Sequence, residues 1–255
     1  GVCAAVAAAR QGARTLLLER GGALGGIMTS GLMSNIIDAE GKRGLLREII
    51  RDLTDLGAKG DRMAFDVETV KAYLEHLCLD AGVEIRLHTL VTAALCDAER
   101  KLRTVITESK SGREAWNGTL FIDCTGDGDL AALAGCSCEL GRPGDGALQA
   151  MSFCALLYGV PADSIPELYR IENDDGKRNL LQALRESSCS PSYERPTLFR
   201  LGPESYLLMS NHQYGFSPLD AGDVTRATVE ARAELQNQLQ SLRIHDSRFA
   251  NARFG

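Results

Sequence analysis

The first twenty residues constrain the fold of this chain more than any other segment. Residues 1–10 place alanine and valine at helical spacing, and Gly12 is a typical stop for the helix that they predict. The continuously apolar run Thr15–Leu18 follows and predicts a short strand that is buried on both faces. Glu19 ends this strand. We therefore expect a helix packed on a buried strand, with an acid at the strand's carboxyl end.

A small-residue helix followed by a buried strand that ends in an acid is the second half of a dinucleotide-binding unit. Gly1 stands where the third glycine of the usual fingerprint belongs, and Ala5 is the small residue that permits close helix–strand packing. Pyrophosphate would lie at the helix N-terminus, on its free N–H groups, and Glu19 would accept hydrogen bonds from ribose hydroxyls. An alanine-rich helix beside a strand, with a solvated Glu19, explains this segment equally well when it is taken alone.

The place of Gly1 in this fingerprint also leads to an expectation about what precedes it. We expect its first two glycines, and the strand before them, to precede Gly1, so that the chain holds part of the phosphate cradle and binds a cofactor poorly by itself. A segment that closes over the cofactor is likewise expected after Gly255.

A cluster of glycines follows the acid: Gly21, Gly22, Gly25, Gly26 and Gly31. So many glycines free the backbone for tight turns and for close approach to a ligand. Thr29 and Ser30 add hydroxyl groups in the same stretch. A nicotinamide-binding domain does not need a glycine loop at this place, whereas a larger cofactor draped over the strand end does. A flexible surface loop is the alternative.

The stretch LLLERGGALGGIMTSGL resembles the signature of FAD-dependent oxidoreductases related to the fumarate reductase and succinate dehydrogenase flavoproteins. The resemblance implies an α/β fold: a Rossmann-like, glutathione-reductase-like FAD-binding domain with a parallel sheet and a β-meander, plus an inserted α+β cap or substrate domain. It also implies that Glu19 binds the FAD ribose, and that the glycine loop and the segment after it line the pyrophosphate and the flavin ring.

A second region of resemblance spans residues 66–91. The apolar spacing predicts a helix over Asp66–Asp80, with Asp66 as N-cap and Gly82 as terminator, and then a strand over Val83–Leu87. This pattern resembles the FDxE…AGV element of the family, which supplies the next parallel strand. The resemblance places backbone groups around Leu90 and Val91 against adenine.

A third region begins with the expected β-meander. Thr104–Glu108 and Thr119–Ile122 predict strands, with Gly112 as a turn signal between them. The stretch FIDCTGDGDLAALAG then predicts a buried strand, a turn and a small-residue helix, and it resembles the D-x-T-G-D-G-D element with which the chain returns to the FAD site. Asp127 and Asp129 also fit ordinary turn and N-cap acids.

The resemblance thus assigns FAD binding to twelve positions across the first domain. They are Gly1, Glu19, Arg20, Gly25, Gly26, Thr29, Ser30, Gly31, Val91, Thr125, Gly126 and Asp127. The corresponding domains are 1–140 for FAD binding, 141–220 for the proline-rich cap, and 221–255 for a helix that returns towards the FAD domain. Within the last, Asp223 is expected to cap a helix over roughly residues 224–242.

Catalytic residues are harder to assign, because a flavin carries the redox step and needs little acid–base help. No triad or metal site is evident. His212 and Arg200 are the candidates for binding or protonating an anionic or carbonyl-bearing substrate, and a solvated loop histidine is the alternative for His212. Cys136 and Cys138 lie two residues apart, which leaves open a redox role, although no CxxC pair is present.

Composition and charge limit the classes of partner that the protein can bind. The net charge of −6 and the absence of basic runs argue against nucleic acid, and no apolar run approaches the roughly 18 residues of a membrane span. Several of the eight cysteines lie in apolar stretches, which favours free, buried thiols and a reducing, cytoplasmic location. We expect a small-molecule substrate; the oligomeric state stays open.

The function that these patterns favour is hydride or electron transfer between bound FAD and a small organic substrate. An electron-transfer flavoprotein subunit of a larger complex and an NAD-dependent Rossmann dehydrogenase are the alternatives. The glycine loop after Glu19, the β-meander and the returning TGD motif argue against the dehydrogenase.

Overall fold

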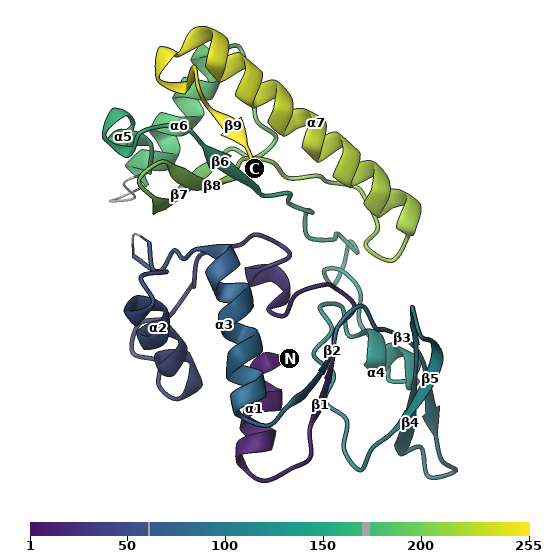
Figure 1. Cartoon of the computed structure of the whole chain (residues 1–255). Helices are drawn as coiled ribbons and strands as arrows, with labels where there is room; N and C mark the ends of the chain where they lie inside the picture. Colours follow the sequence, from purple (N-terminus) through teal and green to yellow (C-terminus); the bar gives the residue numbers. More distant parts are fainter. Residues whose placement is uncertain (61, 170–173) are drawn as a thin grey trace. The chain divides into compact units, whose positions relative to one another are not determined.

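The computed structural model describes residues 1–60, 62–169 and 174–255. The chain forms two compact units: residues 1–30 with 67–139 form the first, and residues 31–66 with 140–255 form the second. The elements of each can be followed by their labels in Figure 1. The structure is mixed α/β, as expected, with one parallel sheet and two antiparallel sheets among the described residues.

The first unit holds the dinucleotide-type elements. In chain order they are α1 (Val2–Arg10), β1 (Leu16–Leu18), the 3-10 turn η1 (Gly26–Met28), α3 (Val67–Asp80), β2 (Glu84–Arg86), β3 (Leu90–Cys96), β4 (Leu102–Ser109), β5 (Gly112–Asn117) and α4 (Asp129–Leu133). Gly12 and Gly82, with φ of +85° and +81°, follow the ends of α1 and α3 and take the left-handed conformation that glycine favours there.

Helices α1 and α3 lie beside the parallel pair β1–β2 (Figure 1). The face of α3 expected to be apolar is buried, and Ala5 and Val6 of α1 are buried as well. The three leucines of β1 are only half-buried, however, which corrects the expectation of burial on both faces. The physical reason is that β1 pairs only with β2 in the described residues, so that its other edge and flank are uncovered.

The β-meander is present, but its strands differ from those expected. It runs β3-β4-β5, with the tight turn at Gly112 joining β4 to β5. Residues 119–124, for which the sequence predicts strand, are irregular, and Leu120 and Ile122 are 76% and 53% exposed. An apolar run becomes a strand only when a neighbouring strand satisfies its backbone, and no described strand pairs with this one.

The second unit is built around an antiparallel sheet of order β7-β8-β6-β9. Its elements are α2 (Leu45–Asp55), β6 (Ala155–Tyr158), the 3-10 turn η2 (Ala162–Ser164), α5 (Pro166–Tyr169), α6 (Asp175–Glu186), β7 (Thr197–Gly202), β8 (Ser205–Met209), α7 (Ala221–His245), η3 (Ser247–Phe249) and β9 (Arg253–Phe254). Buried side chains of the strands, α5, α6 and α7 form one apolar core. Gly60 lies so close to the backbone of Arg200 that a Cβ would meet that carbonyl oxygen at 2.7 Å, which ties the early segment to this sheet.

Helix α7 departs from expectation at its N-terminus. It starts earlier, and its N-cap is Asp220, whose side chain accepts a hydrogen bond from the backbone N–H of Asp223 at 2.8 Å. Val229 is 58% exposed, because the buried face runs through Ala227, Ala231 and Leu235. The helix also packs into the core of the second unit. The functional division into residues 1–140, 141–220 and 221–255 stays a prediction.

The cysteines are all free, and their burial differs from expectation. Cys78 and Cys154 are buried, whereas Cys3, Cys96, Cys124, Cys136 and Cys138 are exposed. The apolar sequence around Cys124 does not bury it, because that segment is the irregular one without a described strand partner.

Candidate cofactor-binding site

Glu19 lies at the carboxyl end of β1, where its side chain is held by its own loop. Its backbone N–H donates to the carbonyl of Arg86 at 2.9 Å, which extends the β1–β2 pairing by one residue. Its carboxylate Oε1 accepts a hydrogen bond from the backbone N–H of Gly21 at 2.6 Å. The other carboxylate oxygen has no protein partner in the described part of the chain, so a ligand can bind it.

The glycine loop after Glu19 folds around Thr29. The Thr29 hydroxyl donates to the carbonyl of Leu24 at 2.5 Å, and the residue is fully buried. Gly25 has φ of +108°, and a Cβ there would meet the Thr29 side chain at 2.7 Å and Leu74 at 2.9 Å. Gly26 also has a positive φ, but nothing lies within 4 Å of where its Cβ would be. Thr29 therefore shapes the loop, and Gly26 presents open backbone.

The N-terminus of α1 lies at the same end of the parallel pair. Gly1 is the N-cap and offers no side chain to the first-turn N–H groups. A Cβ on Gly1 would lie 3.3 Å from Leu17 of β1 and 4.0 Å from Cys124, so the returning segment 121–135 comes back beside this helix end. An uncapped helix N-terminus at the carboxyl end of a parallel strand is a binding position for phosphate.

Asp123 organises the returning loop, and sequence reasoning missed it. One of its carboxylate oxygens accepts from the backbone N–H and hydroxyl of Thr125, and the other accepts from the N–H of Ala131 at 2.8 Å. The Thr125 hydroxyl accepts from the N–H of Asp129 at 2.7 Å. Partial burial works against ionisation, yet these hydrogen bonds lower the pKa of Asp123 overall. The sequence signal was its place as the first acid of the D-x-T-G-D-G-D element, two residues before Thr125.

The structure gathers most of the expected cofactor residues in the first unit. Only Gly31 lies in the second unit. Ser30 is near Glu19, since a Cβ on Gly21 would lie 3.1 Å from Oε1 of Glu19 and 3.8 Å from the Ser30 hydroxyl. Arg20, Gly126 and Asp127 are exposed, and Val91 is half-buried in β3. Asp129 is in the first turn of α4, whose N-cap is Gly128, so Asp129 is not the N-cap acid.

These residues fit the adenosine diphosphate half of FAD. A carboxylate with one oxygen free suits ribose hydroxyls, and an uncapped helix end suits the pyrophosphate. Gly26 and Gly126 have no atom within 4 Å of an added Cβ, so their backbones can be approached closely.

The sequence model of one protein family, FAD dependent oxidoreductase, matches residues 1–255. The chain belongs to the FAD-dependent oxidoreductase family. FAD is accordingly its cofactor class, as the glycine loop and Glu19 indicated. No curated protein sequence matches the chain.

Solved structures similar to this family member support the fold. A geranylgeranyl bacteriochlorophyll reductase-like protein from Thermoplasma acidophilum superposes with a TM-score of 0.56 at 13% identity, over 100% of this chain and 61% of that one. The myxobacterial chondrochloren halogenase, a variant of FAD-dependent halogenases, gives 0.55 at 11% identity over 100% and 58%. A flavin-dependent brominase gives 0.55 at 13% identity over 100% and 63%. The chain thus spans about three fifths of the length of these proteins.

In this family member the candidate catalytic histidine lies in an aromatic and polar cluster of the second unit. The ring of Tyr193 stacks on His212 with centroids 3.9 Å apart, and the Tyr214 hydroxyl lies 3.2 Å from Nδ1 of His212. Burial between these rings lowers the pKa of His212, and the nearby Glu234 carboxylate partly opposes that effect. His212 is therefore an ordered, half-buried group rather than a freely solvated one.

Glu234 of α7 fixes the segment that carries His212. Its carboxylate accepts hydrogen bonds from the backbone N–H and hydroxyl of Ser192, at 2.7 and 2.8 Å, and from the side-chain amides of Gln213 and Gln238, both at 3.0 Å. The Ser192 hydroxyl in turn accepts from the backbone N–H of His212 at 2.9 Å. Sequence reasoning missed this role of Glu234, because its partners are more than twenty residues before it or share its own helix.

Arg200 is not part of the His212 cluster. It pairs with Tyr206 near the turn of the β7–β8 hairpin, whereas His212 follows the far end of β8. Its guanidinium lies 5.6 Å from the ring centre of Tyr169, and its Nε donates to the carbonyl of Gly202 at 3.2 Å. The two candidates therefore do not act at one point.

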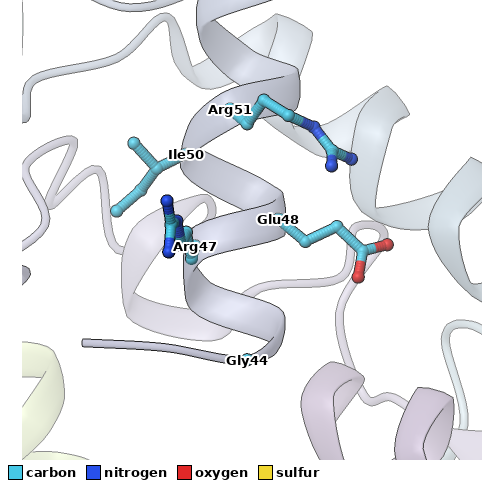
Figure 2. A pocket seen from close by; sticks show the side chains of 5 residues that line it. All are labelled: Gly44, Arg47, Glu48, Ile50 and Arg51. Carbon is cyan, nitrogen blue, oxygen red and sulfur yellow. The ribbon is translucent and has the colours of Figure 1, made fainter.

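A hollow also lies along α2 of the second unit, whereas the candidate cofactor residues other than Gly31 belong to the first unit. It has a volume of about 630 Å³ and is lined by Gly44, Arg47, Glu48, Ile50 and Arg51. Figure 2 shows Arg47 and Ile50 on one side of the helix and Glu48 and Arg51 on the other. Because side chains on opposite sides of one exposed helix do not enclose a ligand, this hollow is not the cofactor site.

Proposed function

We propose that the protein is an FAD-dependent oxidoreductase whose first unit binds the adenosine diphosphate half of the cofactor. The observation that carries this is the geometry at the end of β1, where Glu19 keeps one carboxylate oxygen on Gly21 and leaves the other free of described protein partners. The uncapped N-terminus of α1 lies at the same edge and supports pyrophosphate binding. The positions assigned from the sequence, Gly1 to Asp127, remain our proposal for the site.

Within that site the residues have different roles. Glu19 binds the ribose hydroxyls, and the N–H groups after Gly1 bind the pyrophosphate. Thr29 acts by holding the glycine loop, because its hydroxyl is already bonded to Leu24. Thr125 keeps the returning loop in place through Asp123. Bound FAD would supply the electron or hydride transfer.

We further propose that the substrate is a small organic molecule and that His212 exchanges a proton with it. The Tyr214 hydroxyl at Nδ1 fixes the orientation of the imidazole, and Nε2 has no protein partner in the described residues. A lowered pKa keeps His212 mainly neutral near pH 7, which suits a group that accepts a proton. Arg200 would act separately, as an anion-binding group.

Three finer assignments complete the proposal. Within the family, the order of the three motif regions supports a relation to the fumarate reductase flavoprotein class. The acidic composition supports a protein without a nucleic-acid partner. The free cysteines support a cytoplasmic location. No helix in the described residues has the length and apolarity to cross a bilayer.

The test is FAD binding to the protein and to Glu19→Gln. Equilibrium dialysis reads the affinity even when binding is weak. Loss of a charge-assisted hydrogen bond costs about 1.5–3 kcal/mol, so we expect Glu19→Gln to bind FAD roughly 10- to 100-fold more weakly. Glu84→Gln is the matched control, because Glu84 is an exposed acid on the neighbouring strand β2. Absence of FAD binding by the unmodified protein, or equal affinity in Glu19→Gln, would contradict the proposal.

A further inference from the structure

The loop that carries Glu19 is clamped by a residue from the next strand. After β2 the chain continues alongside the glycine loop, and the backbone N–H of His88 donates to the carbonyl of Gly21 at 3.0 Å. The N–H of Thr89 donates to the carbonyl of Glu19 at 2.9 Å. Two backbone hydrogen bonds therefore hold Glu19 and Gly21 in place.

The His88 imidazole packs directly on Gly22. A Cβ added to Gly22 would lie 2.8 Å from Cε1 and 3.1 Å from Nε2 of His88, closer than real Cβ atoms approach. The absence of a side chain at Gly22 is thus what allows the ring to lie on the loop. Gly22 has no positive φ, so a larger residue there is disfavoured by this contact alone, which the exposed His88 side chain relieves by moving off the loop.

His88 adopts a backbone conformation that is uncommon for residues other than glycine. Its φ is +51°, in the left-handed region, which histidine adopts more often than most residues that carry a side chain but still infrequently. A strained residue persists when surrounding contacts hold it, and such residues gather at ligand-binding positions. Here the holding contacts are those with Gly21 and Gly22.

We propose that His88 is a cofactor-positioning residue for the adenosine half of FAD. The ring fixes Gly22, the His88 N–H fixes the Gly21 carbonyl, and the Gly21 N–H holds Oε1 of Glu19. This chain of contacts presets the free oxygen of Glu19 for the ribose hydroxyls. A loop that is already ordered binds its ligand more tightly, because no conformational entropy of the loop is lost on binding. The inference rests on the proposed FAD site and adds a residue that does not itself need to touch the cofactor.

Affinities for FAD and for ADP, measured on the same variants by equilibrium dialysis, test this assignment. We expect His88→Ala to weaken both by the same factor, about tenfold, since the disturbed loop serves only the adenosine half. His88→Asn keeps a residue that tolerates the left-handed backbone but removes the ring, and it should show a similar loss. His76→Ala, an exposed histidine on α3 of the same unit, is the control and should leave both affinities unchanged.

A double variant separates positioning from a general loss of structure. Gly22→Ala alone should bind FAD more weakly, because its Cβ displaces the His88 ring from the loop. In Gly22→Ala with His88→Ala the ring is already absent, so the affinity should equal that of His88→Ala alone. The melting temperature of each unliganded variant reports folding independently of the cofactor.

The outcomes distinguish this inference from the function on which it rests. If the unmodified protein binds neither FAD nor ADP, the proposed function fails. If it binds both, but His88→Asn binds them equally well, the positioning role is wrong. A fall in FAD affinity without a fall in ADP affinity, or a double variant that binds more weakly than His88→Ala alone, would also overturn it.

Discussion

The carboxylate of Asp123 accepts hydrogen bonds from both the backbone N–H and the hydroxyl of Thr125, at 2.9 and 2.7 Å. Through its other oxygen it also reaches the first turn of α4. One side chain therefore fixes the turn that carries Gly126 and Asp127, and it caps the helix that follows. The acids most visible in the motif, Asp127 and Asp129, do neither.

Asp123→Asn keeps one acceptor oxygen but replaces the other with an amide NH2 group, so it should lose a hydrogen bond and destabilise the protein by about 1 kcal/mol. For a chain of this size that corresponds to a fall in melting temperature of roughly 2–4 °C, measured by thermal unfolding. Asp127→Asn is the control, since Asp127 is exposed. Equal melting temperatures of Asp123→Asn and the unmodified protein would refute the capping role.

The Asp123 effect should depend on pH. Because its pKa is lowered in the folded state, its contribution is present above the unfolded value of about 3.9 and is lost as the pH falls through the folded pKa. The stability difference between the unmodified protein and Asp123→Asn should therefore be constant above about pH 5 and shrink below about pH 4. A difference that grows on acidification would contradict the assigned sign.

His212 should titrate below the ordinary histidine value of about 6.5. The groups that face it are Tyr193, Tyr214 and Glu234. Tyr193→Ala exposes the ring and should raise the pKa, whereas Glu234→Gln removes the favourable charge and should lower it further. Imidazole resonances followed by NMR against pH give the values directly. Shifts of the same sign in both variants would disprove this account.

Two adjacent glycines of the loop should respond differently to the same substitution. Both have positive φ, so alanine costs about 1 kcal/mol at either position. At Gly25 the new Cβ also meets Thr29 and Leu74, and crowding of this kind typically adds roughly 1–3 kcal/mol. We therefore expect Gly25→Ala to unfold at a clearly lower urea concentration than Gly26→Ala. Equal midpoint urea concentrations for the two variants would show that the Thr29 side chain moves to make room for the new Cβ.

Thiol labelling should divide the cysteines by burial. Burial raises the pKa of Cys154 to about 11 and also raises that of Cys78, so both stay protonated and covered at about pH 8. Iodoacetamide at that pH should label Cys96, Cys136 and Cys138 first, as peptide mass spectrometry would report. Labelling of Cys154 as fast as Cys136, under conditions where the protein remains folded, would contradict the structure.

Much of the first unit is predictable, because its signals are local. Apolar spacing and a terminal glycine locate α1 and α3 to within about a residue or two, and the run Thr15–Leu18 locates β1. These signals depend on residues three or four positions apart, so they can be recognised in a single sequence.

The errors arise where distant partners decide the outcome. β5 is polar and alternates weakly, so the sequence favours the apolar segment 119–122 as the last meander strand in its place. The segment that pairs with β4 becomes the strand, and the sequence of neither segment alone shows which one pairs. The role of Glu234 escapes prediction for the same reason, since its partner Ser192 lies 42 residues away in the chain.

The short parallel pair β1–β2 affects how early its backbone amides exchange with solvent. Three residue pairs join these strands, and β1 has no second described neighbour. Outward-facing amides of such a strand exchange with solvent through local opening, well before the whole chain unfolds. Deuterium uptake should therefore appear at Leu16–Leu18 earlier than at β8, which is paired on both edges. Glu19, which we propose as the ribose-binding acid, follows a strand that a bound ligand can protect further against exchange.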